Sequence, residues 1–418
     1  MKKLLVIIVL MALAMNANTQ DFYSVGYYNV SNGTIAALYK NNERLYTAHI
    51  GGLTSKAARV VCNSQGDVFW LVSHYNYPSN TLNRIEIRKN NQVYASTVGH
   101  DEIHLTDMYM INDTLYYTGY QLAENGVTIA TVWKGEDFAT QWVLGDSIHA
   151  SFIYDAEVDK NTNVPYFCGY VSDTLQKACV WEASQLLYKQ EPWGVQKNSN
   201  AREISIDNGE IYTKGFLSYD IDNETISIPT IWKDNEQIYS ASAMDFINCL
   251  YAHNGDYYYT FFYPHGMFYA VYKNRETILQ LPIDQTGVQR IIGDLNDIYM
   301  VGSFQGQGSI WKNFEMHLQP NNCNSIYDMA VSYASANIEE TNENNFAVYP
   351  NPTNNVLFVQ TVHAPSVPNQ TYRVTNLIGQ TLLQGHVTAE TQQIDIANLP
   401  AGMYFINVGE QTVKFVKQ

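Results

Sequence analysis

A short strand-like segment recurs seven times along the chain, and this repetition constrains the fold more than any other feature. Most copies carry the same glycine among aromatic and β-branched residues. Aligned on that column, the copies place these residues at equivalent positions: Gly26, Ser73, Gly119, Gly169, Gly215, Phe261 and Gly302. Neighbouring members are 41 to 50 residues apart, which is near the length of one blade of a β-propeller.

A second column follows each of these segments and holds one aromatic side chain per repeat, with one exception. Its members are Tyr39, Arg88, Trp133, Trp181, Trp232, Tyr272 and Trp311. We expect the four tryptophans to be buried between neighbouring repeats. A short third segment and a fourth segment complete each repeat, and the fourth ends in an Asn, Gly or Asp turn typical of a hairpin. Four strands per repeat predict propeller blades.

The repeats therefore predict an all-β fold with a seven-bladed β-propeller over residues 21–333. The ring is expected to close, because an open array of sheets would leave exposed edges. Ser325–Tyr333 has the pattern of a fourth strand with no strands after it, and the first repeat lacks such a strand. We predict that this segment pairs with strands from residues 22–48. Six or eight blades are the alternatives, since the second repeat drifts from the pattern.

Residues 1–20 predict a secretory signal peptide. Lys2 and Lys3 precede an apolar run over residues 4–15, and small and polar residues follow it. The run is too short for a membrane-spanning helix, which takes about 20 residues. We expect no transmembrane segment in the mature chain, and a retained anchor is the weaker alternative.

The composition limits the partners and the redox chemistry. The 418-residue chain has a formal net charge of -16, and an acidic surface repels phosphates, so we expect no nucleic-acid partner. Five cysteines do not form a disulfide framework in a chain this long. Cys168 and Cys179 flank a predicted hairpin turn, where a disulfide and two buried thiols are the alternatives. We interpret Cys62, Cys249 and Cys323 as buried.

The C-terminal part has a different organisation. Residues 334–345 are polar and acidic and predict a linker. Residues 346–418 contain short strands punctuated by Gly, Pro and Asn, which predicts a small immunoglobulin-like β-sandwich.

Motifs in residues 346–418 resemble the type A sorting domain of proteins exported by the type IX secretion system of Bacteroidetes. The matching residues are Tyr349, Pro350, Asn351, Pro352, Gly379, Leu399, Pro400, Gly402 and Tyr404. The resemblance implies passage through the periplasm, contact with the secretion machinery, and removal of the module by a sortase-like peptidase. The mature protein would be secreted or attached to the outer-membrane surface. A generic fibronectin-like accessory domain is the alternative.

No catalytic constellation stands out in the sequence. The histidines lack paired metal-ligand spacing, and GxSxG, P-loop and GxGxxG motifs in the required context are not found. We expect no cofactor, no metal site and no enzymatic activity. Residues 205–209 resemble an Asp-box, but we interpret them as the turn that every repeat has in some form.

Loops on one face of the predicted ring are the candidates for ligand binding. They carry Tyr75, Tyr77, Trp193, Tyr263 and His265, and such rings stack on sugars or anchor a protein partner. The alternative is that these rings only cover the ends of the blades.

The sequence thus predicts a secreted or cell-surface propeller that binds protein or glycan and is not an enzyme. A propeller hydrolase or lyase acting on extracellular glycan or peptide is the alternative, and a structural surface-layer role is a third, because one fold hosts many functions. Three or more ionisable side chains gathered in the central channel would favour an enzyme. An uncharged channel with an aromatic end would favour binding.

Overall fold

The computed structural model describes residues 20–190, 196–221, 224–243, 245–263, 268–282, 287–294, 297–333, 346–361, 370–376, 380–387, 391–408 and 411–418. The predicted signal peptide up to residue 19, the predicted linker, Trp193, His265 and Gly379 lie outside them. The chain divides into two compact units, Met1–Ser335 and Ala336–Gln418. Within the described ranges, no helix is long and apolar enough to cross a membrane.

The described residues of the first unit form seven four-stranded antiparallel sheets. One sheet joins the two ends of the unit in the order β28 (Ser325–Tyr333), β1 (Gln20–Val30), β2 (Gly33–Lys40) and β3 (Glu43–Ala48). The other six are formed by consecutive strands: β4 (Leu53–Cys62), β5 (Val68–Asn76), β6 (Leu82–Lys89) and β7 (Gln92–Ser96); β8 (Ile103–Ile111), β9 (Thr114–Leu122), β10 (Thr128–Lys134) and β11 (Ala139–Val143); β12 (Ala150–Val158), β13 (Pro165–Ser172), β14 (Gln176–Glu182) and β15 (Gln185–Lys189); β16 (Gln196–Asp207), β17 (Glu210–Ile221), β18 (Glu224–Lys233) and β19 (Glu236–Ser240); β20 (Phe246–His253), β21 (Asp256–Tyr263), β22 (Phe268–Lys273) and β23 (Glu276–Pro282); β24 (Gly287–Asp294), β25 (Asp297–Phe304), β26 (Gln307–Lys312) and β27 (Glu315–Leu318).

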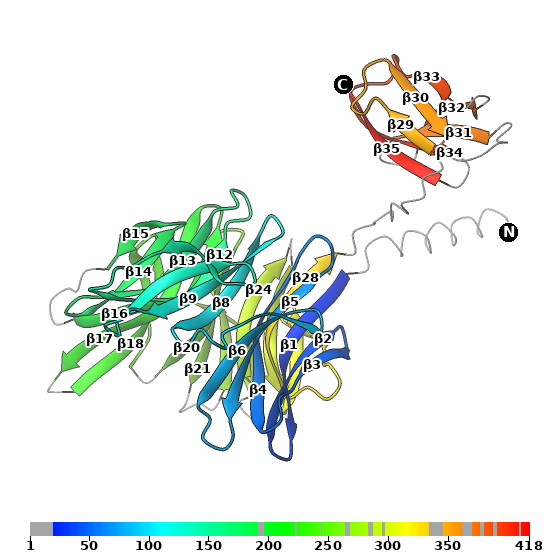
Figure 1. Ribbon diagram of the computed structural model, residues 1–418. Helices are drawn as coiled ribbons and strands as arrows, with labels where there is room; N and C mark the ends of the chain where they lie inside the picture. The colour runs from blue at the N-terminus through cyan, green and yellow to red at the C-terminus, as the bar shows by residue number, and fades with distance from the viewer. Residues whose placement is uncertain are drawn as a thin grey trace. The chain divides into compact units, whose positions relative to one another are not determined.

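Each sheet packs on the next, and the last packs on the first. The inner strands of the sheets contact one another in turn around the ring; they are β28, β4, β8, β12, β16, β20 and β24. The predicted pairing of the two ends is confirmed, because β28 runs antiparallel to β1 with Gln20 opposite Tyr333. Figure 1 shows the two strands side by side. The first unit is therefore a β-propeller.

The tryptophan column is buried as predicted. Trp133, Trp181, Trp232 and Trp311 are no more than 2% exposed. Trp133, for example, belongs to an apolar cluster with Phe69 and Leu71 of the preceding sheet. Where the column holds Arg88, the aromatic comes from the neighbouring strand instead: the Arg88 guanidinium lies 5.7 Å from the ring centroid of Trp70, which is fully buried. The exception in the sequence column thus still brings an aromatic ring to the interface between sheets.

The cysteines form no disulfide. Cys179 pairs with Gly169, and Cys168 pairs with Val180. Because successive residues of a strand point to opposite faces, the two thiols enter different apolar clusters. The disulfide alternative is therefore wrong, since the hairpin register offsets the two residues by one position. The prediction that Cys62 is buried is also wrong, because it ends β4 and is only partly covered.

The second unit contains two antiparallel sheets around one apolar cluster. The first sheet has the order β29 (Phe346–Tyr349), β30 (Val356–Thr361) and β33 (Thr391–Asp395); the second has the order β32 (Thr381–Val387), β31 (Gln370–Thr375), β34 (Gly402–Val408) and β35 (Gln411–Lys417). The unit has its own core, which includes Leu357, Val374, Ile406 and Phe415.

Candidate functional site: the central channel and its two faces

A ring of charged side chains surrounds the centre of the propeller. Six of the inner strands skip one residue in their pairing with the second strand, and the seventh shifts register at the same place. Such a β-bulge turns the residue that follows it. We call the residues at this position the ring residues: Arg59, Asp107, Asp155, Glu203, Cys249, Arg290 and Asp328.

The ring carboxylates bind the backbone of the next sheet. Asp155 Oδ2 accepts a hydrogen bond of 3.1 Å from the backbone N–H of Ile204. The same kind of contact is made by Asp107 to Ala156 N–H, by Glu203 to Leu250 N–H and by Asp328 to Val60 N–H. Because each acceptor and donor lie on adjacent sheets, these side chains hold the inner strands together.

Two arginines form ion pairs with the three ring aspartates. Arg59 Nε lies 2.6 Å from Asp107 Oδ1, and its Nη2 lies 3.5 Å from Asp155 Oδ1. Arg290 Nε lies 3.5 Å from Asp328 Oδ1, and its Nη2 lies 4.0 Å from Asp155 Oδ1. Asp155 therefore lies between the two guanidinium groups. Removing one partner from a buried cluster of this kind destabilises the fold, because a buried charge is left unpaired.

The ring carboxyls have divergent proton affinities. Burial raises the pKa of Asp155 well above its ordinary value, and the charge of Asp107 adds to this rise. Burial opposes ionisation of Asp107 as well, but the charges of Arg59 and Arg290 outweigh it and lower the pKa of Asp107. The two carboxyls also share a hydrogen bond. Asp155 therefore holds its proton more tightly than Asp107 does.

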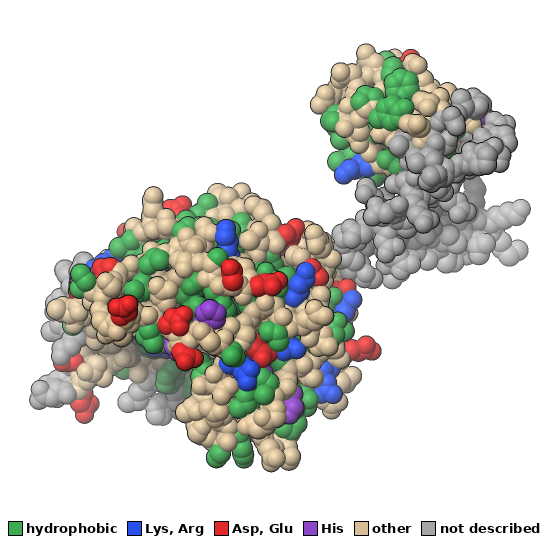
Figure 2. Space-filling view, viewed as in Figure 1, with side chains coloured by type: hydrophobic (Ala, Val, Ile, Leu, Met, Phe, Trp, Pro, Cys, Tyr) green, Lys and Arg blue, Asp and Glu red, His purple; other side chains and the backbone are tan. Residues whose placement is uncertain are grey.

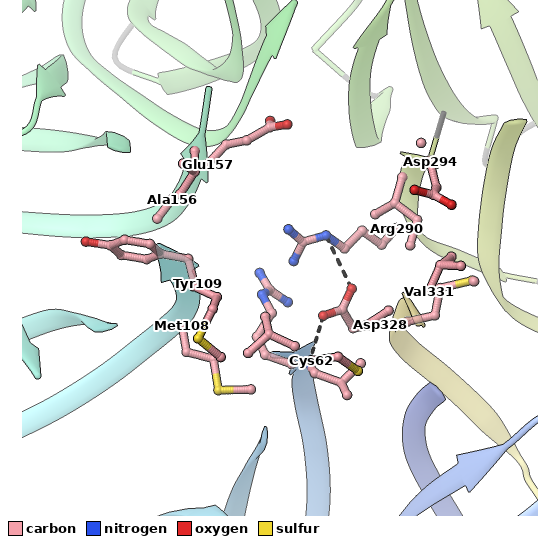
Figure 3. Close-up of a pocket in the computed structure, with 18 of the residues that line it drawn as sticks. Cys62, Met108, Tyr109, Ala156, Glu157, Arg290, Asp294, Asp328 and Val331 are labelled. Atoms are coloured by element: carbon pink, nitrogen blue, oxygen red, sulfur yellow. Dashed lines mark hydrogen bonds and ion pairs between the residues drawn. The ribbon is translucent and has the colours of Figure 1, made fainter. Parts of the chain in front are cut away.

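A pocket of about 500 Å³ opens at one end of this ring. Its lining includes Arg59, Glu157, Lys160, Arg290 and Asp328 together with apolar side chains such as Met108 and Val331. Figure 3 shows Arg290 extending from its strand into the pocket with Asp328 beside it. Burial raises the pKa of Glu157 to about 7. The pocket therefore combines an apolar wall with charges of both signs.

The propeller has two chemically different faces. We call the face with the hairpins from inner to second strands the turn face, and the opposite one the loop face. Exposed large apolar side chains lie either on the outermost strands or on the loop face; those of the loop face are Val30, Tyr77, Leu82, Val98, Leu122, Ile148 and Phe246. Turns of the turn face are rich in Asn, with positive φ at Asn41, Asn112, Asn208 and Asn254 among others. Figure 2 shows acidic and basic side chains interspersed over the visible surface, without a large patch of one sign.

The two predicted ligand residues whose side chains the structure describes, Tyr75 and Tyr77, do not line the charged pocket. Tyr77 follows β5 on the loop face and is 56% exposed. Tyr75 is half-buried near Tyr327, a residue of the inner strand β28. Tyr263 ends β21, also on the loop face. The pocket opens at the turn-face end instead, where the inner strands end.

Sequence reasoning missed the ring residues. They form an aligned column of mostly charged side chains in the middle of the otherwise apolar fourth segments, in ARV, TDM, YDA, REI, NCL, QRI and YDM. That column is the signal that would have found them. Within residues 205–209, Asn208 and Gly209 form the predicted turn and have positive φ, while residues 205–207 end β16. Asp207 Oδ2 accepts a hydrogen bond of 2.6 Å from Gly255 N–H of the next sheet.

Histidines do not gather into a metal site in the described part of the chain. No group of three or more His, Cys, Asp or Glu side chains there is placed to hold a metal ion. His104 instead stacks on Tyr120, with ring centroids 4.5 Å apart.

The sorting motif residues bind the two ends of the second unit together. Asn351 Nδ2 donates to Lys414 O at 3.1 Å, and Asn351 Oδ1 accepts from Val416 N–H at 2.9 Å. Tyr404 Oη donates to Pro400 O at 2.7 Å, and its ring stacks on Phe415. Leu399 is buried in the core, whereas Tyr349, Pro350, Pro352 and Gly402 are exposed.

Comparisons with known proteins assign the second unit. Residues 347–418 match the sequence model of the secretion system C-terminal sorting domain. No curated protein matches the chain.

Solved structures with some similarity include propellers. PorZ, described as an essential bacterial surface component of the type IX secretion system of Porphyromonas gingivalis, is 10% identical, with 92% of this chain and 74% of that chain covered and a TM-score of 0.32. The β-propeller domain of the Trilobed protease from Pyrococcus furiosus is 10% identical, with 71% and 96% covered and a TM-score of 0.33. Apo AztD from Citrobacter koseri is 9% identical, with 77% and 99% covered and a TM-score of 0.38. These TM-scores are too low to support an argument about function.

The C-terminal match implies export by the type IX secretion system, to the cell surface or to the medium. The chain thus consists of a β-propeller followed by a type IX secretion sorting domain at residues 347–418.

Proposed function

We propose that this protein is a binding module delivered to the cell surface or the medium, and that it contacts a protein or a glycan through the loop face. The observation that carries the proposal is the one-sided distribution of exposed apolar side chains. Apart from those on the outermost strands, they lie on the loop face. Such side chains mark interaction sites when they gather on one surface.

The ends of the first unit support this choice of face. Gln20 pairs with Tyr333 where β1 begins and β28 ends, at the turn face. The first and the last described residues of the propeller therefore both lie at the turn face, opposite the exposed apolar side chains of the loop face. In the same proposal, the seven sheets are the blades of a closed seven-bladed propeller, and the two C-terminal sheets form an immunoglobulin-like sandwich.

The charged ring supports a structural role for most of its members. Asp107, Asp155, Glu203 and Asp328 each accept a backbone N–H of the neighbouring sheet. A carboxyl group that holds two sheets together is a poor choice for a reacting group, because its movement during turnover would disturb that contact.

An enzyme is the second candidate, and Glu157 is the observation in its favour. Its pKa of about 7 suits a general acid or base at neutral pH, and it lines the 500 Å³ pocket with Lys160 and Arg290. The gathering of ionisable groups in the channel is the feature expected of a hydrolase or lyase. Under this alternative the substrate would enter from the turn face.

One experiment separates the two candidates. The exported chain is immobilised and tested against a glycan array and a surface-protein extract, using the wild type, a loop-face variant (Tyr77→Ala, Ile148→Ser) and a pocket variant (Glu157→Gln). Binding that is lost only in the loop-face variant supports the proposal. Turnover of a bound glycan or peptide that depends on Glu157 would replace the proposal with the enzyme.

A further inference from the structure

A small cleft on the loop face lies between the β1–β2 hairpin and the loop that follows β5. It has a volume of about 270 Å³ and is lined by Gly33, Thr34, Thr54, Lys56, Asn76, Tyr77, Pro78 and Asn80. Pockets for drug-sized ligands are larger, about 300–1,000 Å³. The dimensions therefore suit one unit of a longer ligand better than an enclosed small molecule.

Three polar groups in the cleft are available to a ligand. Asn76 and Thr34 are already engaged, with Thr81 and with Ser55 O respectively. Among the described residues, the Lys56 ammonium forms no ion pair and the Asn80 amide no hydrogen bond. The Tyr77 hydroxyl likewise forms no hydrogen bond with the described residues, and Tyr77 is 56% exposed.

The charge of the cleft differs from that of the whole chain. No carboxylate lines it, and Lys56 is its one charged residue, although the chain has a net charge of -16. The Lys56 Nζ atom lies 5.5 Å from the ring centroid of Tyr27. Tyr27 in turn lies 5.9 Å from Tyr327 on the inner strand β28. Lys56, Tyr27 and Tyr327 thus form a row of contacts from the cleft to the inner strand β28.

We propose that this cleft, the Tyr77 cleft, binds one acidic residue of a glycan. The apolar face of the sugar ring packs on Tyr77, as sugars do on aromatic rings. The Lys56 ammonium pairs with the sugar carboxylate in a charge-assisted hydrogen bond, and the Asn80 amide binds a hydroxyl. This proposal rests on the proposed binding function and specifies its ligand class.

The test compares acidic oligosaccharides with neutral counterparts of the same length. Oligogalacturonates and their fully methyl-esterified forms are titrated into the exported chain by calorimetry, and hyaluronan fragments and their esters form a second pair. Variants are Tyr77→Ala, Tyr77→Phe and Lys56→Gln. Controls are Leu186→Ala, an exposed apolar residue of the outer strand β15, and Lys134→Gln, an exposed lysine at the end of β10.

The two side chains should have separable effects. Tyr77→Ala weakens binding of the acid and the ester alike, by about tenfold or more, while Tyr77→Phe binds as the wild type does. Lys56→Gln weakens binding of the acid by about tenfold and leaves the ester unchanged. The control variants bind normally, and all variants unfold at the wild-type temperature.

Four outcomes would overturn the proposal. Equal binding of acid and ester by the wild type removes the role of Lys56. Sugar binding that survives Tyr77→Ala places the glycan elsewhere on the protein and leaves the binding function intact. If the propeller captures a surface protein but binds none of these sugars, the binding function remains and the acidic glycan is excluded. If it binds neither a protein nor a sugar, both proposals are contradicted.

Discussion

Gly169 lies so close to the backbone carbonyl oxygen of Phe152 that a Cβ atom in its place would be 1.7 Å from that oxygen. Phe152 is on the inner strand β12, just before its bulge, and Gly169 is on the second strand β13. The same approach recurs at the other glycines of the column, which are Gly26, Gly119, Gly215 and Gly302. The recurring glycine and the bulge that positions the charged ring are therefore parts of one structural device.

Replacing Gly169 with alanine should destabilise the propeller by about 3 kcal/mol, because the new methyl group meets backbone rather than a movable side chain. Urea denaturation of the purified protein measures the change. Gly51→Ala is the matched control, since no atom lies within 4 Å of the added Cβ there. Equal stability of the two variants would contradict the steric explanation.

Truncating Trp232 to alanine should lower the free energy of unfolding by about 3–5 kcal/mol, the range for a large buried aromatic. The side chain is 2% exposed and lies beside Val180 and Tyr188 of the preceding sheet. Trp142→Ala, at a half-buried position on the outer strand β11, should cost clearly less. Thermal and chemical denaturation would reveal the difference, and a reversed order would exclude the tryptophan column as the main interface between sheets.

Replacing Arg59 with methionine should cost about 3–5 kcal/mol, because Asp107 is then left as a buried, unpaired carboxylate. The matched control is Lys40→Met, which removes an exposed pair with Asp21 at 2.9 Å and should cost less than about 1 kcal/mol. The Arg59 variant should also gain stability towards acidic pH, where Asp107 becomes protonated. A variant as stable as the control would show that the ring does not hold the sheets together.

Glu157 should make the protein less stable as pH rises from about 4.5 to about 7. Burial raises the pKa of its carboxyl from 4.5 in the unfolded chain to about 7 in the fold. Between these values the unfolded state releases the proton while the folded state keeps it, so stability falls with pH and levels off above 7. Glu157→Gln should remove this slope and gain about 3 kcal/mol at pH 8. Denaturation at several pH values tests it, with the exposed Glu43→Gln as the variant whose slope stays unchanged.

The repeat made the arrangement of strands predictable, while the site was only partly so. The glycine and tryptophan columns could be found because they recur at equal spacing, and the pairing of β28 with β1 followed from the missing strand of the first repeat. The bulges could not be found in the same way, since one extra residue in each inner strand leaves the apolar pattern on both sides intact. The exposure of Tyr77 could be predicted, because an aromatic residue in a predicted loop has no core to enter.

The cysteine prediction failed for a related reason. Whether Cys168 faces Cys179 depends on hairpin register, and a shift of one residue moves a side chain to the other face of the sheet. Composition and spacing do not fix that register. The Tyr77 cleft needed the structure as well, because Lys56 lies on β4, Tyr77 follows β5, and both meet the β1–β2 hairpin of the neighbouring sheet.

The last prediction concerns transport, and it follows from the separation of the chain into two units. β28 ends at Tyr333, before the second unit begins, so deletion of residues 346–418 leaves every strand of the propeller in place. The shortened protein should fold and remain in the periplasm, whereas the intact protein should reach the surface or the medium. The exported form should also lose its C-terminal module and become smaller than the translated 47.5 kDa, unless a surface glycan adds mass.

The measurement is cell fractionation with a tag inserted at the exposed residues Gly51 and Gly52. Asn351→Ala provides a point variant, because it releases the last strand β35 from the start of the module and should reduce export without touching the propeller. Surface delivery of the shortened protein at the level of the intact one would show that the sorting domain is not the export address of this chain.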